Sequence, residues 1–193
     1  MPCTGSPRGD DQAACGIGEN GAMPPHRASL GVRRLAAWCV DWLIISAYAA
    51  LLVPVGLLIA RSVQLSAAAG NVLSFGCLVA PATLWLTLWE RGLRAASPGK
   101  RLLGLRVRIV DDGQPGFGRA LARNALKVTL PWELGHSAAF TLASPAASTR
   151  VGVVGLICGL LACGIALVYA ASLFVGTGRT PYDRIAGTQV DRV

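Results

Sequence analysis

The sequence predicts an all-α membrane protein, a bundle of about four transmembrane helices with a short cytoplasmic β-capable loop and tail. Apolar residues make up 53% of the 193 positions, charged residues only 15%, and the mean hydropathy is +0.51. An ordinary soluble domain has about a quarter of its residues charged, so this chain carries too few charges to cover a surface in water. The same composition argues against a disordered chain or a disulfide scaffold.

The first 29 residues differ from the rest of the chain. Residues 1–29 are rich in glycine, proline and polar residues, which predicts a disordered N-terminal arm. The arm is not expected to be a signal peptide, because the first apolar run begins only near Leu35 and is too long for one. Met23 is a candidate start of the native chain. Residues 30–193 are expected to form one transmembrane domain.

Three apolar runs are long enough to cross a bilayer. Residues 35–60 are interrupted only by Asp41 and Pro54, and at about 1.5 Å per residue they reach roughly 39 Å. Residues 67–89 form the second run, and residues 151–175 form the third, which contains no charged residue.

Two of these runs carry additional signals. Trp85 and Trp89 lie toward one end of the second run, as interfacial anchors do. Gly155 and Gly159 of the last run have the spacing that lets helices pack closely. This spacing suits dimerisation, but packing against a helix of the same chain would use the same surface.

A fourth segment, residues 120–143, is interrupted by polar and charged residues. It fits an interfacial helix, a re-entrant segment or a true span. If it crosses, 16 of the 18 basic residues fall on one side of the membrane and two on the other; if it does not, the division is 14 to four. The positive-inside rule therefore favours four crossings in an inner membrane, with both termini cytoplasmic.

Two segments outside the apolar runs have strand character. Residues 102–110 alternate apolar and basic side chains before a turn at Asp111, and residues 185–193 are also β-capable. With four crossings these segments lie on the same side of the membrane and can pair. With three crossings they cannot.

The net charge of +8 is attributed to topology. The basic residues sit between apolar runs and form no basic face on a soluble fold, so nucleic acid is not an expected partner. The lipid bilayer is the expected partner, together with a second copy of the chain or another membrane protein.

Three short blocks resemble the RDD family of small multi-pass membrane proteins. They read RRLAAWCVDW at 33–42, SPGKRLLGLRV at 97–107 and YDRIAGTQV at 182–190, and they occur in the order that the family shows. The arginine and the two aspartates that name the family match Arg34, Asp41 and Asp183. The resemblance implies a transport-associated membrane protein with an undefined ligand. Tyr182 stands where the family often has histidine, which weakens any proton-handling role there.

Asp41 is the sharpest single feature, because an ionised carboxylate at membrane depth is costly and often marks an ion or substrate path. Arg34 lies two helical turns earlier on the same face. The alternative is a buried polar contact that fixes helix packing, and the residues alone do not decide between the two.

Glu133 and His136 are three positions apart on one helical face and are candidates for a metal or a proton relay. Two ligands are too few for a metal site, and the first histidine of H-E-x-x-H is missing. A hydrogen-bonded polar pair is the alternative, so no metal is expected.

Lys100 and Arg101 form a basic loop that is expected to meet lipid phosphates at the membrane surface. The loop lacks the spacing of a nucleotide-binding P-loop. Asp183 is a candidate partner for this loop in a charged network below Asp41.

Two classes of function follow. One is transport of an ion or small solute, with Arg34, Asp41, Glu133, His136 and Asp183 as pathway candidates. The other is a non-transporting scaffold or accessory subunit, in which these charges lock helix packing. The chain is not expected to be an enzyme or to bind a cofactor, because no catalytic set or nucleotide motif is present.

Overall fold

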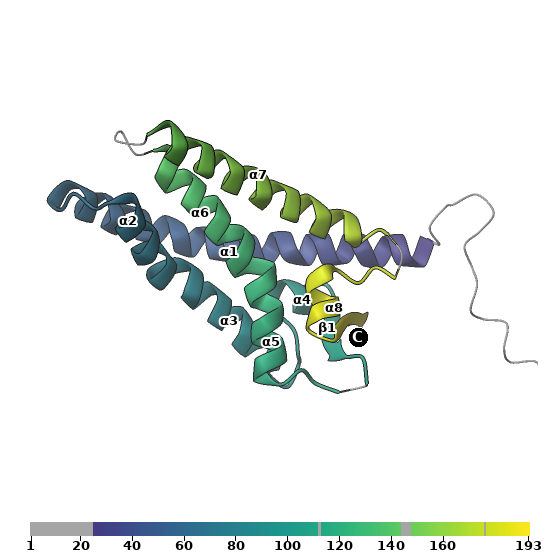
Figure 1. Cartoon of the computed structure of the whole chain (residues 1–193). Coiled ribbons are helices and arrows are strands. Elements are labelled where there is room, and N and C mark those ends of the chain that lie inside the picture. Colours follow the sequence, from purple (N-terminus) through teal and green to yellow (C-terminus); the bar gives the residue numbers. More distant parts are fainter. Residues whose placement is uncertain (1–24, 112, 144–147, 176) are drawn as a thin grey trace, which may run out of the picture.

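A computed structural model describes residues 25–111, 113–143, 148–175 and 177–193. The chain is mostly helical, with one small sheet at one end (Figure 1). The first helix, α1, spans Pro25–Ser62 and so begins inside the segment expected to be an N-terminal arm. The rest of that expected arm, including Met23, lies outside the described residues.

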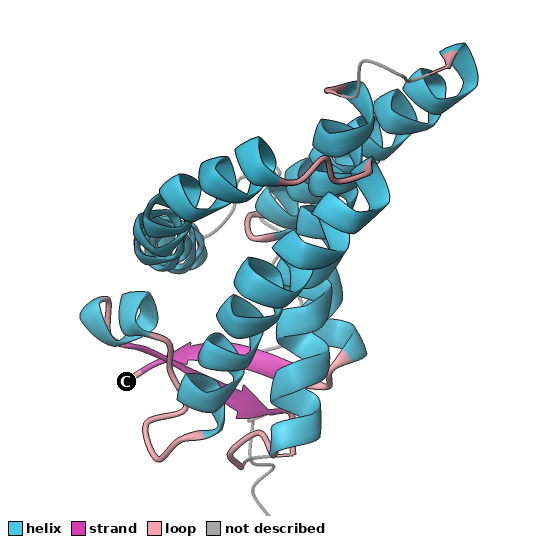
Figure 2. Cartoon of the chain, turned by 90° about the vertical axis from the view of Figure 1, so that its left-hand side faces the viewer, coloured by secondary structure: helices cyan, strands magenta, loops and turns pink. Residues whose placement is uncertain are grey.

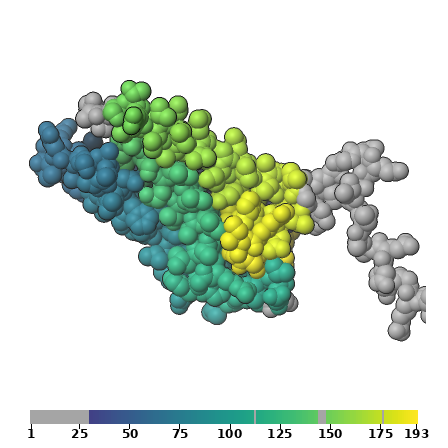
Figure 3. Space-filling model, viewed as in Figure 1, coloured from purple at the N-terminus to yellow at the C-terminus, as the bar shows by residue number. Residues whose placement is uncertain are grey.

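Two further helical rods are each built from three consecutive elements. The first comprises α2 (Ala67–Ser74), η1 (Phe75–Val79) and α3 (Ala80–Arg91); the second comprises α5 (Phe117–Asn124), η2 (Ala125–Thr129) and α6 (Leu130–Leu142). The last long helix, α7, spans Thr149–Ser172 and packs along α6 (Figure 1). In the space-filling view the middle of the chain lies between the 67–91 rod and α7 (Figure 3).

Among the residues that the structure describes, three helical segments are long and apolar enough to cross a membrane: Leu30–Ser62, Ala67–Arg91 and Thr149–Ser172. They correspond to the three apolar runs of the sequence. The interrupted segment expected at 120–143 is a continuous helical rod from Phe117 to Leu142.

Glycine spacing in α7 serves packing within the chain. A Cβ at Gly155 would lie 2.3 Å from Thr141 Oγ1, and a Cβ at Gly159 would lie 3.5 Å from the Cβ of Ala138. Gly155 therefore allows α7 to lie close to α6. The same surface cannot also join a second copy of the chain while α6 covers it.

Both composite rods contain a π-helical segment just before a proline, Pro81 in one and Pro131 in the other. Proline has no N–H to donate and its ring displaces the preceding turn, so a carbonyl there loses its usual donor. Tyrosines from neighbouring helices replace that donor.

The two tyrosines reach carbonyls four residues before Pro81 and five residues before Pro131. The Tyr48 hydroxyl of α1 donates to the Cys77 carbonyl at 2.6 Å, and the Tyr169 hydroxyl of α7 donates to the Leu126 carbonyl at 2.9 Å. Such substitution from a neighbouring helix is how proline is tolerated in apolar helices.

A small sheet joins two distant parts of the chain (Figure 2). Strand β1 (Leu105–Ile109) pairs antiparallel with β2 (Thr188–Arg192), so that Val107 lies opposite Val190. The expected strand character of residues 102–110 and 185–193 is confirmed. Short helices precede both strands, α4 (Pro98–Leu102) and α8 (Pro181–Ile185).

One stripe of α1 is buried, whereas most of the helix is exposed as a lipid-facing helix would be. The stripe consists of Arg34, Ala37, Asp41 and Ile45, spaced three or four residues apart on one face. The Ile45 end of the stripe meets α3, and Ala37 packs beside β1 and β2. This stripe brings Asp41 inside the protein.

We expect Tyr48→Phe to destabilise the protein by about 1 kcal/mol, the usual net value of one hydrogen bond. In a Pro81→Ala background the restored N–H at position 81 replaces the tyrosine, so the same change should have little effect. Unfolding in a mild detergent, followed by circular dichroism, measures both. An equal effect of Tyr48→Phe in the two backgrounds would contradict this account of the proline.

Candidate functional site

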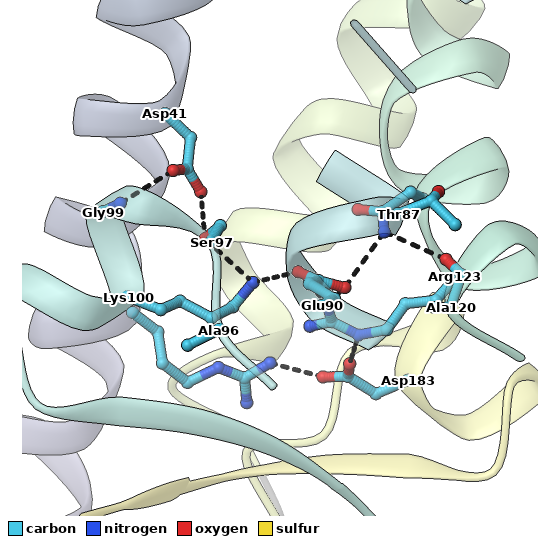
Figure 4. A network of polar contacts seen from close by, with 12 residues as sticks. Asp41, Thr87, Glu90, Ala96, Ser97, Gly99, Lys100, Ala120, Arg123 and Asp183 are labelled. Carbon is cyan, nitrogen blue, oxygen red and sulfur yellow. Dashed lines mark hydrogen bonds and ion pairs between the residues drawn. The ribbon is translucent and has the colours of Figure 1, made fainter. Parts of the chain in front are cut away.

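Seven acidic and basic side chains are buried within the described residues, and they gather where α1, α3, α4, α5, η2 and α8 meet (Figure 4). They are Arg34, Asp41, Glu90, Lys100, Arg123, Lys127 and Asp183. Buried charges are expected to be paired, so we follow the partners of each acid in turn. We call these seven residues the buried charge network.

Asp41 joins α1 to the beginning of α4. Its Oδ2 accepts from Ser97 Oγ at 2.6 Å, and its Oδ1 accepts from the Gly99 backbone N–H at 2.9 Å (Figure 4). The first N–H groups of a helix have no partner within that helix, and Asp41 supplies one from another helix. A Cβ at Gly99 would lie 2.1 Å from the Ala37 carbonyl oxygen, so only glycine permits this approach.

Glu90, near the end of α3, is surrounded by donors. Arg123 Nη1 donates to its two oxygens at 2.7 and 2.6 Å, and Asn124 Nδ2 donates at 3.0 Å. Lys100 of α4 forms an ion pair with the same carboxylate (Figure 4). Glu90 thus holds α3, α4 and α5 together.

Asp183 of α8 pairs with two arginines. Arg123 Nε donates to its Oδ1 at 2.8 Å, and Arg34 of α1 pairs with its Oδ2. Burial alone would raise the pKa of Asp183, but the charges of Arg123 and Arg34 lower that pKa to about 2. The Asp183 side chain also accepts from the Thr180 backbone N–H at 3.3 Å, which caps α8.

Lys127 differs from the other members of the network. Its side chain is only 4% exposed, yet its ammonium makes no hydrogen bond or ion pair within the described residues. It lines a small cavity of about 20 Å³ together with Arg34, Asp41, Lys100 and Arg123, with Tyr169 of α7, and with Leu173 just after that helix. That volume suits roughly one water molecule.

The network carries one positive charge more than it can pair, since four basic residues face three acids. Glu90 and Asp183 are engaged by Lys100, Arg123 and Arg34, and Asp41 is engaged by neutral donors. Both Lys127 and Asp41 line the cavity. An anion or the loss of a proton would balance the excess charge.

Glu133 and His136 of α6 lie outside this network, where α6 contacts α2. Glu133 Oε2 accepts from Asn71 Nδ2 at 3.3 Å, and His136 lies 2.9 Å from Ser74 Oγ and accepts from Trp132 Nε1 at 2.7 Å. The two predicted residues are thus each held by other partners. No group of three metal-ligating side chains occurs among the described residues.

The structure separates the two residues of the expected basic loop. Lys100 is buried against Glu90 instead of facing lipid, because the acid at the end of α3 needs a counter-charge. Arg101 keeps a surface position, with its guanidinium 4.0 Å from the centre of the Trp89 ring. Asp183 pairs with Arg34 and Arg123 and not with this loop.

Three members of the network were not singled out from the sequence: Glu90, Arg123 and Lys127. Glu90 follows Trp89 at the end of an apolar run, where a charge usually marks the membrane surface. Arg123 and Lys127 are four residues apart and so share a helical face, which is the one signal that could have drawn attention to them.

Comparison with known proteins adds a family match. The model of the RDD family matches residues 27–190. No curated protein and no solved structure matches the chain. The matched range contains every member of the buried charge network.

Arg123→Leu should destabilise the protein by about 3–5 kcal/mol, because it leaves two buried carboxylates short of a partner. Arg119→Leu, one turn earlier on α5 and exposed, is the matched control and should change stability by less than about 0.5 kcal/mol. Thermal unfolding in detergent measures both. Similar effects of the two substitutions would show that Arg123 does not hold the network.

The low pKa of Asp183 predicts acid sensitivity. Its folded pKa of about 2 lies below the ordinary 3.8, so its stabilising contribution is complete above ~pH 4 and is lost as the pH falls toward 2. Melting temperatures measured from pH 6 to pH 2 should fall more steeply for the wild type than for Asp183→Asn. Parallel curves would contradict the ion pairs assigned to Asp183.

Proposed function

The chain belongs to the RDD family, and on that premise we propose that this membrane protein carries a small inorganic ion across the bilayer. Asp41 and Lys127 form two sides of the site through which the ion passes. The observation that carries the proposal is the buried, unpaired ammonium of Lys127 beside a cavity in an otherwise paired network.

The proposed topology has four crossings in an inner membrane, with both termini cytoplasmic. Pairing of β1 with β2 supports an even number of crossings between them, because both strands must lie on one side of the membrane. The rod Phe117–Leu142 and α7 are the two crossings. Sixteen of the 18 basic residues then lie on the cytoplasmic side.

The ion that best fits the site is a monovalent anion. The network has one unbalanced positive charge, and a cavity of about 20 Å³ excludes polyatomic solutes much larger than water. A halide such as chloride meets both conditions. The oxygens of Asp41 are already engaged by Ser97 and Gly99, so Asp41 is not expected to act as a free ligand for a cation.

The second candidate is a membrane scaffold or accessory subunit. It is favoured by the observation that Asp41, Glu90 and Asp183 all have partners within the protein, as residues that lock packing do. In that case the cytoplasmic sheet would be the part that docks another protein.

Flux from proteoliposomes tests the proposal. Chloride efflux, measured with an electrode, should exceed that from protein-free vesicles, and Lys127→Met should reduce it at least about tenfold because the compensating charge is removed. Arg119→Gln removes an exposed charge from the same rod and should leave the efflux unchanged.

The outcomes separate the alternatives. Sodium or potassium flux without halide flux would contradict the anion and keep transport. Vesicles with no flux of any of these ions, together with a stoichiometric partner after purification in mild detergent, would support the scaffold instead. Halide flux that Lys127→Met leaves intact would place the path away from the cavity.

A further inference from the structure

A second basic site lies outside the buried charge network, on the surface beside the sheet. It is a groove of about 490 Å³ between the 93–96 segment, α4 and β1. Four arginines line it: Arg94, Arg101, Arg106 and Arg108. No aspartate or glutamate does. We call it the arginine groove.

Two guanidinium groups of the arginine groove, those of Arg101 and Arg106, leave donors available. Arg101 uses Nε to bond the Ala96 carbonyl at 3.0 Å and rests its face on Trp89, so its two Nη groups extend beyond these contacts. Arg106 Nε is buried and has no hydrogen-bond partner. A buried donor without a partner is unusual, and Arg106 Nε can donate to an acceptor that enters the groove.

The like charges in the groove are close enough to affect one another. Burial and the nearby charge of Arg94 lower the pKa of Arg101. Repulsion between these two guanidinium charges is therefore present at the groove. An anion with several acceptor oxygens would relieve it, and phosphate matches the fork of a guanidinium in geometry.

The position of the groove indicates where the phosphate comes from. Trp89 and Arg91 end the membrane-capable segment Ala67–Arg91, and the groove begins only a few residues later at Leu93. Tryptophan is enriched at the level of lipid headgroups. The groove therefore begins at the level expected for lipid headgroups.

We propose that the arginine groove binds the phosphate of an anionic phospholipid headgroup. The site is independent of ion passage, because it shares only the α4 backbone with the buried charge network. It replaces the expected basic loop at Lys100 and Arg101: Lys100 turns inward, and Arg94 and Arg106 join Arg101 at the surface.

Native mass spectrometry of the purified full chain tests the proposal. After incubation with equal amounts of phosphatidylglycerol and phosphatidylcholine, we expect phosphatidylglycerol to be retained at least about tenfold more often. The double variant Arg94→Gln, Arg106→Gln should lose this preference. Its folding is checked by an unchanged melting temperature in lipid-free detergent.

The matched control removes the same charge elsewhere. Arg61→Gln with Arg150→Gln alters two exposed arginines far from the groove and should keep the preference for phosphatidylglycerol. Equal retention of the two lipids by the wild type, or an equal loss in both double variants, would overturn the proposal. Displacement of the lipid by millimolar inorganic phosphate would also overturn it, since the site would then serve a soluble phosphate compound.

Discussion

Arg123 is the residue on which the arrangement of helices depends. It is buried, and its guanidinium contacts Glu90 on one side and Asp183 on the other. Neither acid can be buried there without it, because an isolated carboxylate inside a protein is strongly unfavourable. Glu90 in turn positions Lys100, and Asp183 positions Arg34. Helices α1, α3, α4, α5 and α8 are therefore related to one another through one side chain.

The buried charge network has a different effect on helix packing in a bilayer than it would have in water. Between apolar helices, lipid is as good a neighbour as another helix, so burial of leucine does not choose which helices meet. A buried ion pair is a weak source of stability by itself, but breaking it is costly. Here the pairs select one packing: Gly99 brings α4 onto α1, and Asp41 fixes that contact through Ser97 and the Gly99 N–H.

The helices, the strands and part of the site could be predicted from the sequence. Apolar runs predict spans because their length is set by the bilayer, and the strands at 105–109 and 188–192 follow from local alternation. The sequence did not predict that the side chains of Glu90 and Lys100 point into the protein. A charge at the end of a span is usually at the surface, and only a partner distant in sequence, Arg123, turns it inward. Long-range pairing of this kind leaves no periodic signal.

The position of Asp183 has a consequence for synthesis. It follows every partner of its carboxylate in the chain, and β2, which follows it, pairs with a strand made more than 70 residues earlier. While the ribosome is still completing α8, Arg34 and Arg123 already exist without the acid that neutralises them. The helices that enter the membrane first are thus left incompletely matched until the last segment arrives. A nascent chain cut short before α8 would expose this mismatch, which is a feature that membrane quality-control proteases could recognise.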